Sequence, residues 1–149
     1  MITVTDIRKV KEGQYDVVWA IVRSYKGGSE WIEHVPELAP SFELLRKANT
    51  LKNAKMWDVE TFNAIYVPAF LKEFRKRETL IKLRELMQLD KQGKSIALVC
   101  LCPHEEDCHR CIVAGLLQGA GLNVSVPSGN DYSNYYKMYR KIHHLKPVK

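Results

Sequence analysis

The stretch Lys94–Val126, KSIALVCLCPHEEDCHRCIVAGLLQGAGLNVSV, decides the fold of this chain. Its first part, Ser95–Leu101, is a short apolar run with β-branched residues, which is typical of a buried strand. Apolar residues at helical spacing over Cys108–Leu117 then predict a packed helix, with Asp107 placed to cap it. Strand character returns at the end of the stretch. The loop Cys102–Asp107 should therefore lie beyond the carboxyl end of a strand, where ligands bind in open α/β sheets.

A second buried strand is predicted at Asp16–Val22, a near-continuous apolar run like those of parallel strands that are covered on both faces. If this strand runs parallel to Ser95–Leu101, Arg23 and Ser24 lie at the same edge of the sheet as the cysteine loop. Arg23 is then a candidate clamp for an anion, because the planar guanidinium matches phosphate and carboxylate. The alternative is an exposed arginine at a strand end that binds no ligand.

The remaining elements complete an α/β pattern. We expect a short edge strand at Ile2–Thr5 and helices at residues 40–51, from Asp58 to a break at Pro68, around 80–87 and at 131–142. A chain of 149 residues with an apolar share of 46% can build one sizeable core. The predicted fold is a single α/β domain over residues 1–149 with three layers, in which a mainly parallel sheet carries helices on both faces.

Charge, hydropathy and cysteine usage narrow the partners and the compartment. The net charge of +6 favours anionic partners, which include small anionic molecules, nucleotides and nucleic acids. The chain has no run of about 20 apolar residues that would predict a membrane span, and its first residues lack the apolar centre of a signal peptide. All four cysteines lie within Cys100–Cys111, so they cannot staple distant parts of a secreted fold. We therefore expect a cytoplasmic protein with no membrane partner.

The first interpretation of the cysteine loop is catalytic. Cys102 and Cys108 are the nucleophile candidates, because a helix N-terminus lowers the pKa of a thiol and favours a bound anion. His109 can carry protons, and Arg110 and His104 can contact an anionic substrate. The loop does not match a phosphatase loop, since seven residues separate Cys102 from Arg110 and none of them is glycine.

Metal binding and simple packing are the two other interpretations. The spacing C-x-C-x5-C-x2-C, with two histidines nearby, contains the ligand types of a zinc site. Cys108 and Cys111 would lie on one face of the helix and could share an ion. Alternatively, Cys100 and Cys111 are buried and behave as small apolar residues. Because the spacing is less favourable than two separated CxxC pairs, no residue is assigned to a metal, and zinc stays an open alternative.

The helix predicted at residues 131–142 carries tyrosines interleaved with basic residues. They are Tyr132, Tyr135, Tyr136 and Tyr139, with Lys137, Arg140 and Lys141 between or beside them. Such a pattern can stack on a nucleic acid and neutralise it, whereas a packed aromatic face with a solvated basic side is the more common arrangement. A nucleic-acid-binding module, with or without structural zinc, is therefore the alternative to an enzyme.

Several of these segments resemble one family. Leu98-Val-Cys100 followed by Asp107-Cys108-His109-Arg110 resembles the Cys-His-Arg motif of the domain-of-unknown-function 488 family (DUF488). Glu37-Leu-Ala-Pro-Ser41, followed by the Trp57 to Tyr66 region, resembles its YeaO-like branch, and Val22-Arg23-Ser24 resembles its strand-end arginine motif. The resemblance covers about residues 16–126. It departs at Ile21-Val22, where the family has an acidic residue, and at Cys102 and Cys111, which are not family features.

The resemblance implies a compact α/β domain with a pocket shared by Arg23 and the segment Cys108–Arg110, and it implies no established reaction. Together with the residue pattern, it favours an intracellular enzyme that acts on a phosphate-bearing or nucleotide-like substrate. In this hypothesis Arg23, Ser24, Arg110 and His104 contact the substrate, and Cys108, Cys102 and His109 perform the chemistry.

Overall fold

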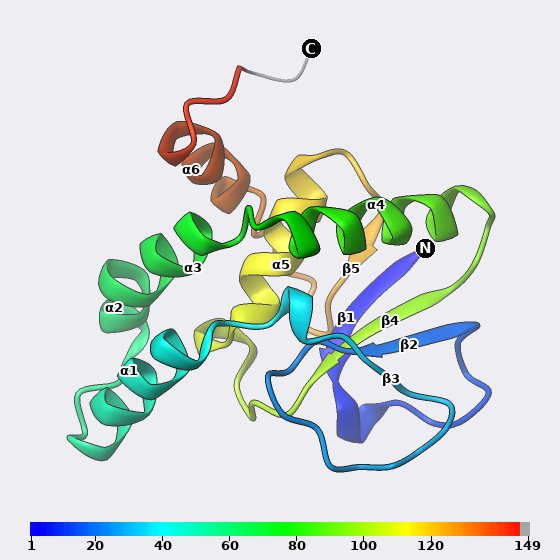
Figure 1. The fold of residues 1–149 in the computed structure, drawn as a ribbon, viewed down its shortest axis with the longest axis horizontal. Helices are drawn as coiled ribbons and strands as arrows, with labels where there is room; N and C mark the ends of the chain where they lie inside the picture. The colour runs from blue at the N-terminus through cyan, green and yellow to red at the C-terminus, as the bar shows by residue number, and fades with distance from the viewer. Residues whose placement is uncertain (147–149) are drawn as a thin grey trace.

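The computed structural model describes residues 1–146, and residues 147–149 of the predicted domain lie outside the described part. Its centre is a five-stranded sheet in the order β3-β2-β4-β1-β5, in which every pair of neighbours is parallel (Figure 1). The strands are β1 (Ile2–Asp6), β2 (Val17–Ala20), β3 (Glu33–His34), β4 (Ile96–Cys100) and β5 (Val124–Ser125). The prediction of a single α/β domain with a parallel sheet is confirmed.

The two strands with the clearest apolar sequence pattern, β2 and β4, are neighbours in the sheet, as the predicted site needs. β2 pairs with β4 in parallel, from Val17 opposite Ile96 to Ala20 opposite Val99. The carboxyl ends of both strands therefore lie at the same edge of the sheet. This confirms that the residues after β2 and the cysteine loop after β4 open onto one edge.

The N-terminal strand has a different place from the predicted one. β1 lies between β4 and β5, so it is an interior strand and not an edge strand. Its side chains Ile2 and Val4 are fully buried. The edge strands of the sheet are instead β3 and β5. Each has only two residues, too few to show the alternating pattern by which a strand is predicted from sequence.

The helices begin and end close to the predicted residues. They are α1 (Phe42–Asn53), α2 (Val59–Thr61), α3 (Val67–Glu73), α4 (Arg77–Lys91), α5 (His109–Gly119) and α6 (Asn134–Ile142). Ser41 and Asp58 cap α1 and α2, with side-chain oxygens that accept from the amides of Leu44 and Thr61. The break expected at Pro68 is a π-helical turn over Phe62–Tyr66, which joins α2 to α3.

The helical layer covers one face of the sheet. The buried side chains of the helices join one core with Ile2, Trp19 and Leu98, which lie on that face. On the opposite face, strand residues such as Ala20 and Val99 belong to a second, smaller core that loops close. Its members outside the strands and the cysteine loop come from the segments after β1 and β2 and are Ile7, Val10, Tyr15, Val22, Tyr25, Trp31 and Ile32. Within residues 1–146, the predicted helices on both faces are therefore corrected to one helical layer, with loops on the second face.

The connections explain this correction. Residues 7–16 join β1 to β2 and residues 21–32 join β2 to β3, and neither connection contains an α-helix. A crossover that includes a helix needs at least about 10–12 residues, so these connections have little length to spare. The apolar strand pattern showed that both faces were buried, but burial under a loop and burial under a helix read alike in a strand. No helix within the described residues is long and apolar enough to cross a membrane.

Gly115 is one of two glycines of α5 that allow the C-terminal segment to approach this helix closely. Gly115 is buried in α5, and a Cβ at this position would overlap the backbone carbonyl of Tyr132. We expect Gly115→Ala to lower the free energy of unfolding by about 1–3 kcal/mol, the usual cost of overpacking. Helix propensity alone predicts the opposite sign, a gain of up to about 1 kcal/mol. Urea unfolding of the two proteins measures the difference, and a stabilised variant would contradict the close contact.

Candidate functional site

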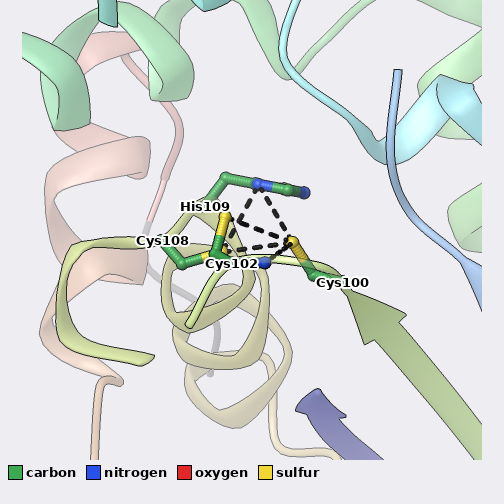
Figure 2. A group of neighbouring side chains, drawn as sticks. All are labelled: Cys100, Cys102, Cys108 and His109. Carbon is green, nitrogen blue, oxygen red and sulfur yellow. Dashed lines mark hydrogen bonds between the residues drawn. The ribbon is translucent and has the colours of Figure 1, made fainter. Parts of the chain in front are cut away.

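Three cysteines and one histidine meet where β4 ends and α5 begins. Cys100 is the last residue of β4, Cys102 follows in the loop, and Cys108 and His109 start α5. Figure 2 shows their side chains turned toward one another. Their ligand atoms all lie within 4.8 Å of one another, so the four residues could hold a metal ion.

The contacts within this Cys–His cluster are short. The Cys100 sulfur lies 3.4 Å from the Cys102 sulfur and 3.3 Å from the Cys108 sulfur. His109 Nδ1 lies 4.0 Å from the Cys100 sulfur and 3.7 Å from the Cys108 sulfur (Figure 2). All four cysteines of the chain are free thiols. The cluster is therefore a set of unbridged donor atoms around one point.

A hydrogen bond fixes the orientation of the His109 ring. Nε2 lies 2.6 Å from the carbonyl oxygen of Ile21, and the residue is buried. Because a carbonyl only accepts hydrogen bonds, Nε2 carries the proton and Nδ1 presents its lone pair to the sulfurs. The ring also lies 5.8 Å from the ring of Phe70 in α3. The helical core therefore supports the histidine from behind.

Burial and contacts between the thiols give Cys100 and Cys108 different pKa values. Hydrogen bonds with the thiols of Cys102 and Cys108 hold the pKa of Cys100 far below its usual range. Burial, followed by the hydrogen bond with Cys100, raises the pKa of Cys108. The predicted nucleophile Cys108 therefore has an environment that opposes its thiolate when no cation is bound.

Cys111 takes no part in the cluster. It is buried in the helical core, and burial raises the pKa of its thiol to about 12. Its sulfur lies 3.9 Å from the carbonyl oxygen of Glu106. This agrees with the packing interpretation for Cys111 and excludes the pairing of Cys108 with Cys111 as the centre of this cluster.

The cluster forms one side of a cavity of about 210 Å³. The wall includes Arg23 and Ser24 from the segment after β2, and it includes all four residues of the cluster. The other lining residues are Val22, Pro40, Leu45, Ala48, Lys52, Trp57, Tyr66, Leu101 and Asp107. Five of the seven residues predicted for the site, Arg23, Ser24, Cys102, Cys108 and His109, thus line one cavity.

Arg23 already uses much of its hydrogen-bonding capacity within the chain. Its Nε donates to the carbonyl oxygen of Pro40 at 2.9 Å, and its Nη2 donates to that of Pro36 at 3.1 Å. The guanidinium carbon lies 5.3 Å from the centre of the Phe42 ring. Arg23 therefore holds the segment before α1 in place and at the same time brings a positive charge to the cavity wall.

Arg110 and His104 lie outside the cavity wall. Arg110 is 4% exposed and donates from Nη1 to the carbonyl oxygen of Cys102 at 2.7 Å. It supports the cysteine loop from beneath and does not face the cavity. His104 is exposed and belongs neither to the cluster nor to the lining. The substrate contacts predicted for these two residues have no counterpart in the lining.

The predicted cap of the site helix is one residue off. Glu105–Asp107 forms a short 3₁₀ turn, and Cys108 takes the N-cap position of α5 without a side-chain capping bond. Asp107 lines the cavity and does not cap the helix. The 3₁₀ turn delays the helix start, so a thiol occupies the position where an aspartate was expected.

Three residues of the cavity wall, Lys52, Trp57 and Tyr66, come from segments that no sequence motif connects with the cysteine loop. Trp57 and Tyr66 lie edge to face with ring centres 5.6 Å apart. Lys52 lies at the end of α1, with its Nζ 5.0 Å from the centre of the Trp57 ring. Burial raises the pKa of the Tyr66 phenol, and the neighbouring thiols add to this shift. They give the cavity an aromatic side and a second cation.

Fold and site together define an α/β protein with a Cys–His centre and a cavity at the carboxyl edge of its parallel sheet. The family model DUF488-N3a, described as the active DUF488-N3 subclade, matches residues 4–121. The chain belongs to the DUF488 family. This confirms the family suggested by the Cys-His-Arg motif, while the YeaO-like branch stays a prediction. Comparisons with curated proteins and with solved structures gave no match to this chain.

Proposed function

We propose that the chain is an enzyme that binds a phosphate-bearing or nucleotide-like small molecule in the cavity and acts on it beside the Cys–His cluster. One observation carries this proposal. The cavity joins cationic and aromatic side chains from one part of the chain to the cluster from another. A concave, mostly apolar site with a few convergent polar groups is the usual form of a small-molecule site.

The lining suits a flat anionic molecule. Trp57 and Tyr66 offer aromatic surface of the kind on which bases stack, and Arg23 and Lys52 offer positive charge. The net charge of +6 acts in the same direction.

The nucleic-acid alternative is less well supported. The tyrosines of the C-terminal segment pack against the helical core, and Tyr139 donates from its hydroxyl to the carbonyl oxygen of Phe74 at 3.0 Å. Tyr135 donates to Asn63 at 3.2 Å. Aromatic rings in such contacts are not free to stack on bases. The alternative then depends on the net charge, the clustered thiols and the basic side chains of α6.

Binding of nucleoside monophosphates and phosphosugars tests the proposal. At 100 times its dissociation constant, a ligand should raise the free energy of unfolding by about 2.7 kcal/mol, which thermal unfolding detects. Lys52→Ala should weaken binding roughly tenfold, through loss of one charged hydrogen bond of about 1.5 kcal/mol. Mass analysis of the stabilising compound after incubation then shows whether the protein converts it.

Lys47→Ala is the matched control, because Lys47 is an exposed lysine of α1 that does not line the cavity. It should leave binding unchanged. The double variant Lys137→Ala/Arg140→Ala should also leave it unchanged. If only short oligonucleotides stabilise the chain, and the double variant alone loses that effect, the small-molecule proposal is wrong.

A further inference from the structure

We propose that Cys100, Cys102, Cys108 and His109 bind one zinc ion through three sulfur atoms and the histidine Nδ1. This inference concerns the same cavity as the proposed function, and it can be tested without any substrate. It selects one ligand set from the four cysteines and five histidines of the chain, and it leaves Cys111 out.

Four of the six distances between the ligand atoms are close to those around a tetrahedral ion, and all six are within 4.8 Å. Zinc bonds of about 2.3 Å to sulfur and about 2.0–2.1 Å to nitrogen place neighbouring sulfurs about 3.8 Å apart and a sulfur and a nitrogen about 3.6 Å apart. The sulfur–sulfur distances here are 3.3 and 3.4 Å, and the sulfur–nitrogen distances are 3.7 and 4.0 Å. Every one of these distances lies within about 0.5 Å of the expected value. Thiolate and imidazole ligands in this arrangement select zinc over magnesium or calcium.

The orientation of His109 suits a metal ligand. A metal-bound imidazole usually donates its other N–H to a carbonyl or a carboxylate, which fixes the tautomer and the ring direction. His109 has this partner in the carbonyl oxygen of Ile21, at 2.6 Å. Its Nδ1 therefore points a lone pair at the three sulfurs, as a ligand would.

The charge of such a site is compatible with its surroundings. Three thiolates, one neutral imidazole and Zn²⁺ carry a net charge of −1. Arg110 is 4% exposed, forms no salt bridge within the described residues, and has an Nε without a hydrogen-bond partner. The nearby carboxylate of Asp6 is paired with Arg8. A zinc centre of charge −1 beside the loop that Arg110 supports would be a suitable counter-charge for this buried cation.

Four protein ligands are the usual complement of a closed zinc site. The ion would tie the end of β4, the loop and the start of α5 together and form the floor of the cavity. Cys102 and Cys108 would then serve as ligands and not as nucleophiles. Proton transfer to a substrate would fall to other groups of the wall, such as Asp107 and Tyr66.

Metal content of the full chain tests the inference directly. Protein purified without chelator and then supplied with zinc should hold about one equivalent after removal of excess metal. Cobalt in place of zinc should give the visible bands of a tetrahedral ion and a thiolate-to-cobalt charge-transfer band, and the latter should lose about one third of its intensity in Cys102→Ala. Less than about a tenth of an equivalent of zinc, or a disulfide among these cysteines in the fresh protein, would overturn the inference.

Cys100→Ala and Cys111→Ala form a matched pair, because each removes one buried thiol. Zinc affinity should fall at least a hundredfold in the first variant and stay unchanged in the second. Equal losses in both variants would contradict the ligand set. If Cys100→Ala fails to fold, the half-buried Cys102 and the cobalt spectrum of the unaltered chain still decide the question. If the chain holds the expected zinc but binds none of the nucleotides and phosphosugars, that result counts against the proposed function and not against the zinc site.

Discussion

Chelation of the zinc ion proposed for the Cys–His cluster should lower the unfolding temperature of the chain by about 8–16 °C. A metal present at about 1,000 times its dissociation constant adds about 4.1 kcal/mol to the folded state. In a chain of about 150 residues each kcal/mol shifts the midpoint by about 2–4 °C. The proposed ligands come from β4, the loop after it and the start of α5, and only the folded chain holds them around one point. Metal binding therefore stabilises the folded state, and the effect should appear in global unfolding. Calorimetry with and without a strong chelator measures it.

Two cysteine variants serve as controls for the chelation experiment. Cys111→Ala should show the full shift on chelation, because Cys111 lies in the core outside the cluster. Cys100→Ala should show a smaller shift, of at most about 3–6 °C, because a metal at 1,000 times the original dissociation constant is at most about 10 times that of a variant with hundredfold weaker binding. An unaltered chain that melts at the same temperature with and without chelator would refute a stabilising metal at this cluster.

The fold could be predicted from the sequence as far as local patterns determine it. The apolar runs in β2 and β4 identified two buried parallel strands, and Asp58 caps the helix that was expected to begin there. Placement was harder. Nothing in the sequence of β1 shows that it pairs on both sides, because that depends on β5, which has only two residues.

The candidate site was predictable in part for the same reason. Cys102, Cys108 and His109 are close in sequence, and parallel strands carry Arg23 to the same edge. Trp57 and Tyr66 reach the cavity through the path of α1 and the π-helical turn, which no local pattern encodes. The direction in which a side chain points from a loop or a helix start also depends on contacts with distant parts of the chain. Proximity in sequence therefore predicts a site role for Arg110 and His104, whereas Arg110 is buried with a hydrogen bond to the loop and His104 is exposed.

Truncation of Phe70 should cost about 3–5 kcal/mol of unfolding free energy, the usual loss for a buried phenylalanine replaced by alanine. Phe70 is fully buried in α3. Its ring stacks between Tyr66 and Phe74, with ring centres 6.1 and 5.0 Å away, and it also lies against His109. Phe70→Ala would thus open a cavity at the point where the helical core supports the histidine. Typical domains have only about 5–15 kcal/mol of stability, so the loss is a large share of the total.

Urea unfolding of Phe70→Ala and of a surface control measures this loss. Ile81→Ala in α4 is a suitable control, because Ile81 is 55% exposed and should change stability by no more than about 0.5 kcal/mol. Zinc content provides a second readout. If Phe70 supports the ring of His109, the folded variant should bind zinc more weakly, by about tenfold, as outer contacts of metal ligands usually do when lost. A loss of stability below about 1.5 kcal/mol would show that the aromatic stack is not the packed support described here, since such small costs belong to volume-conserving exchanges.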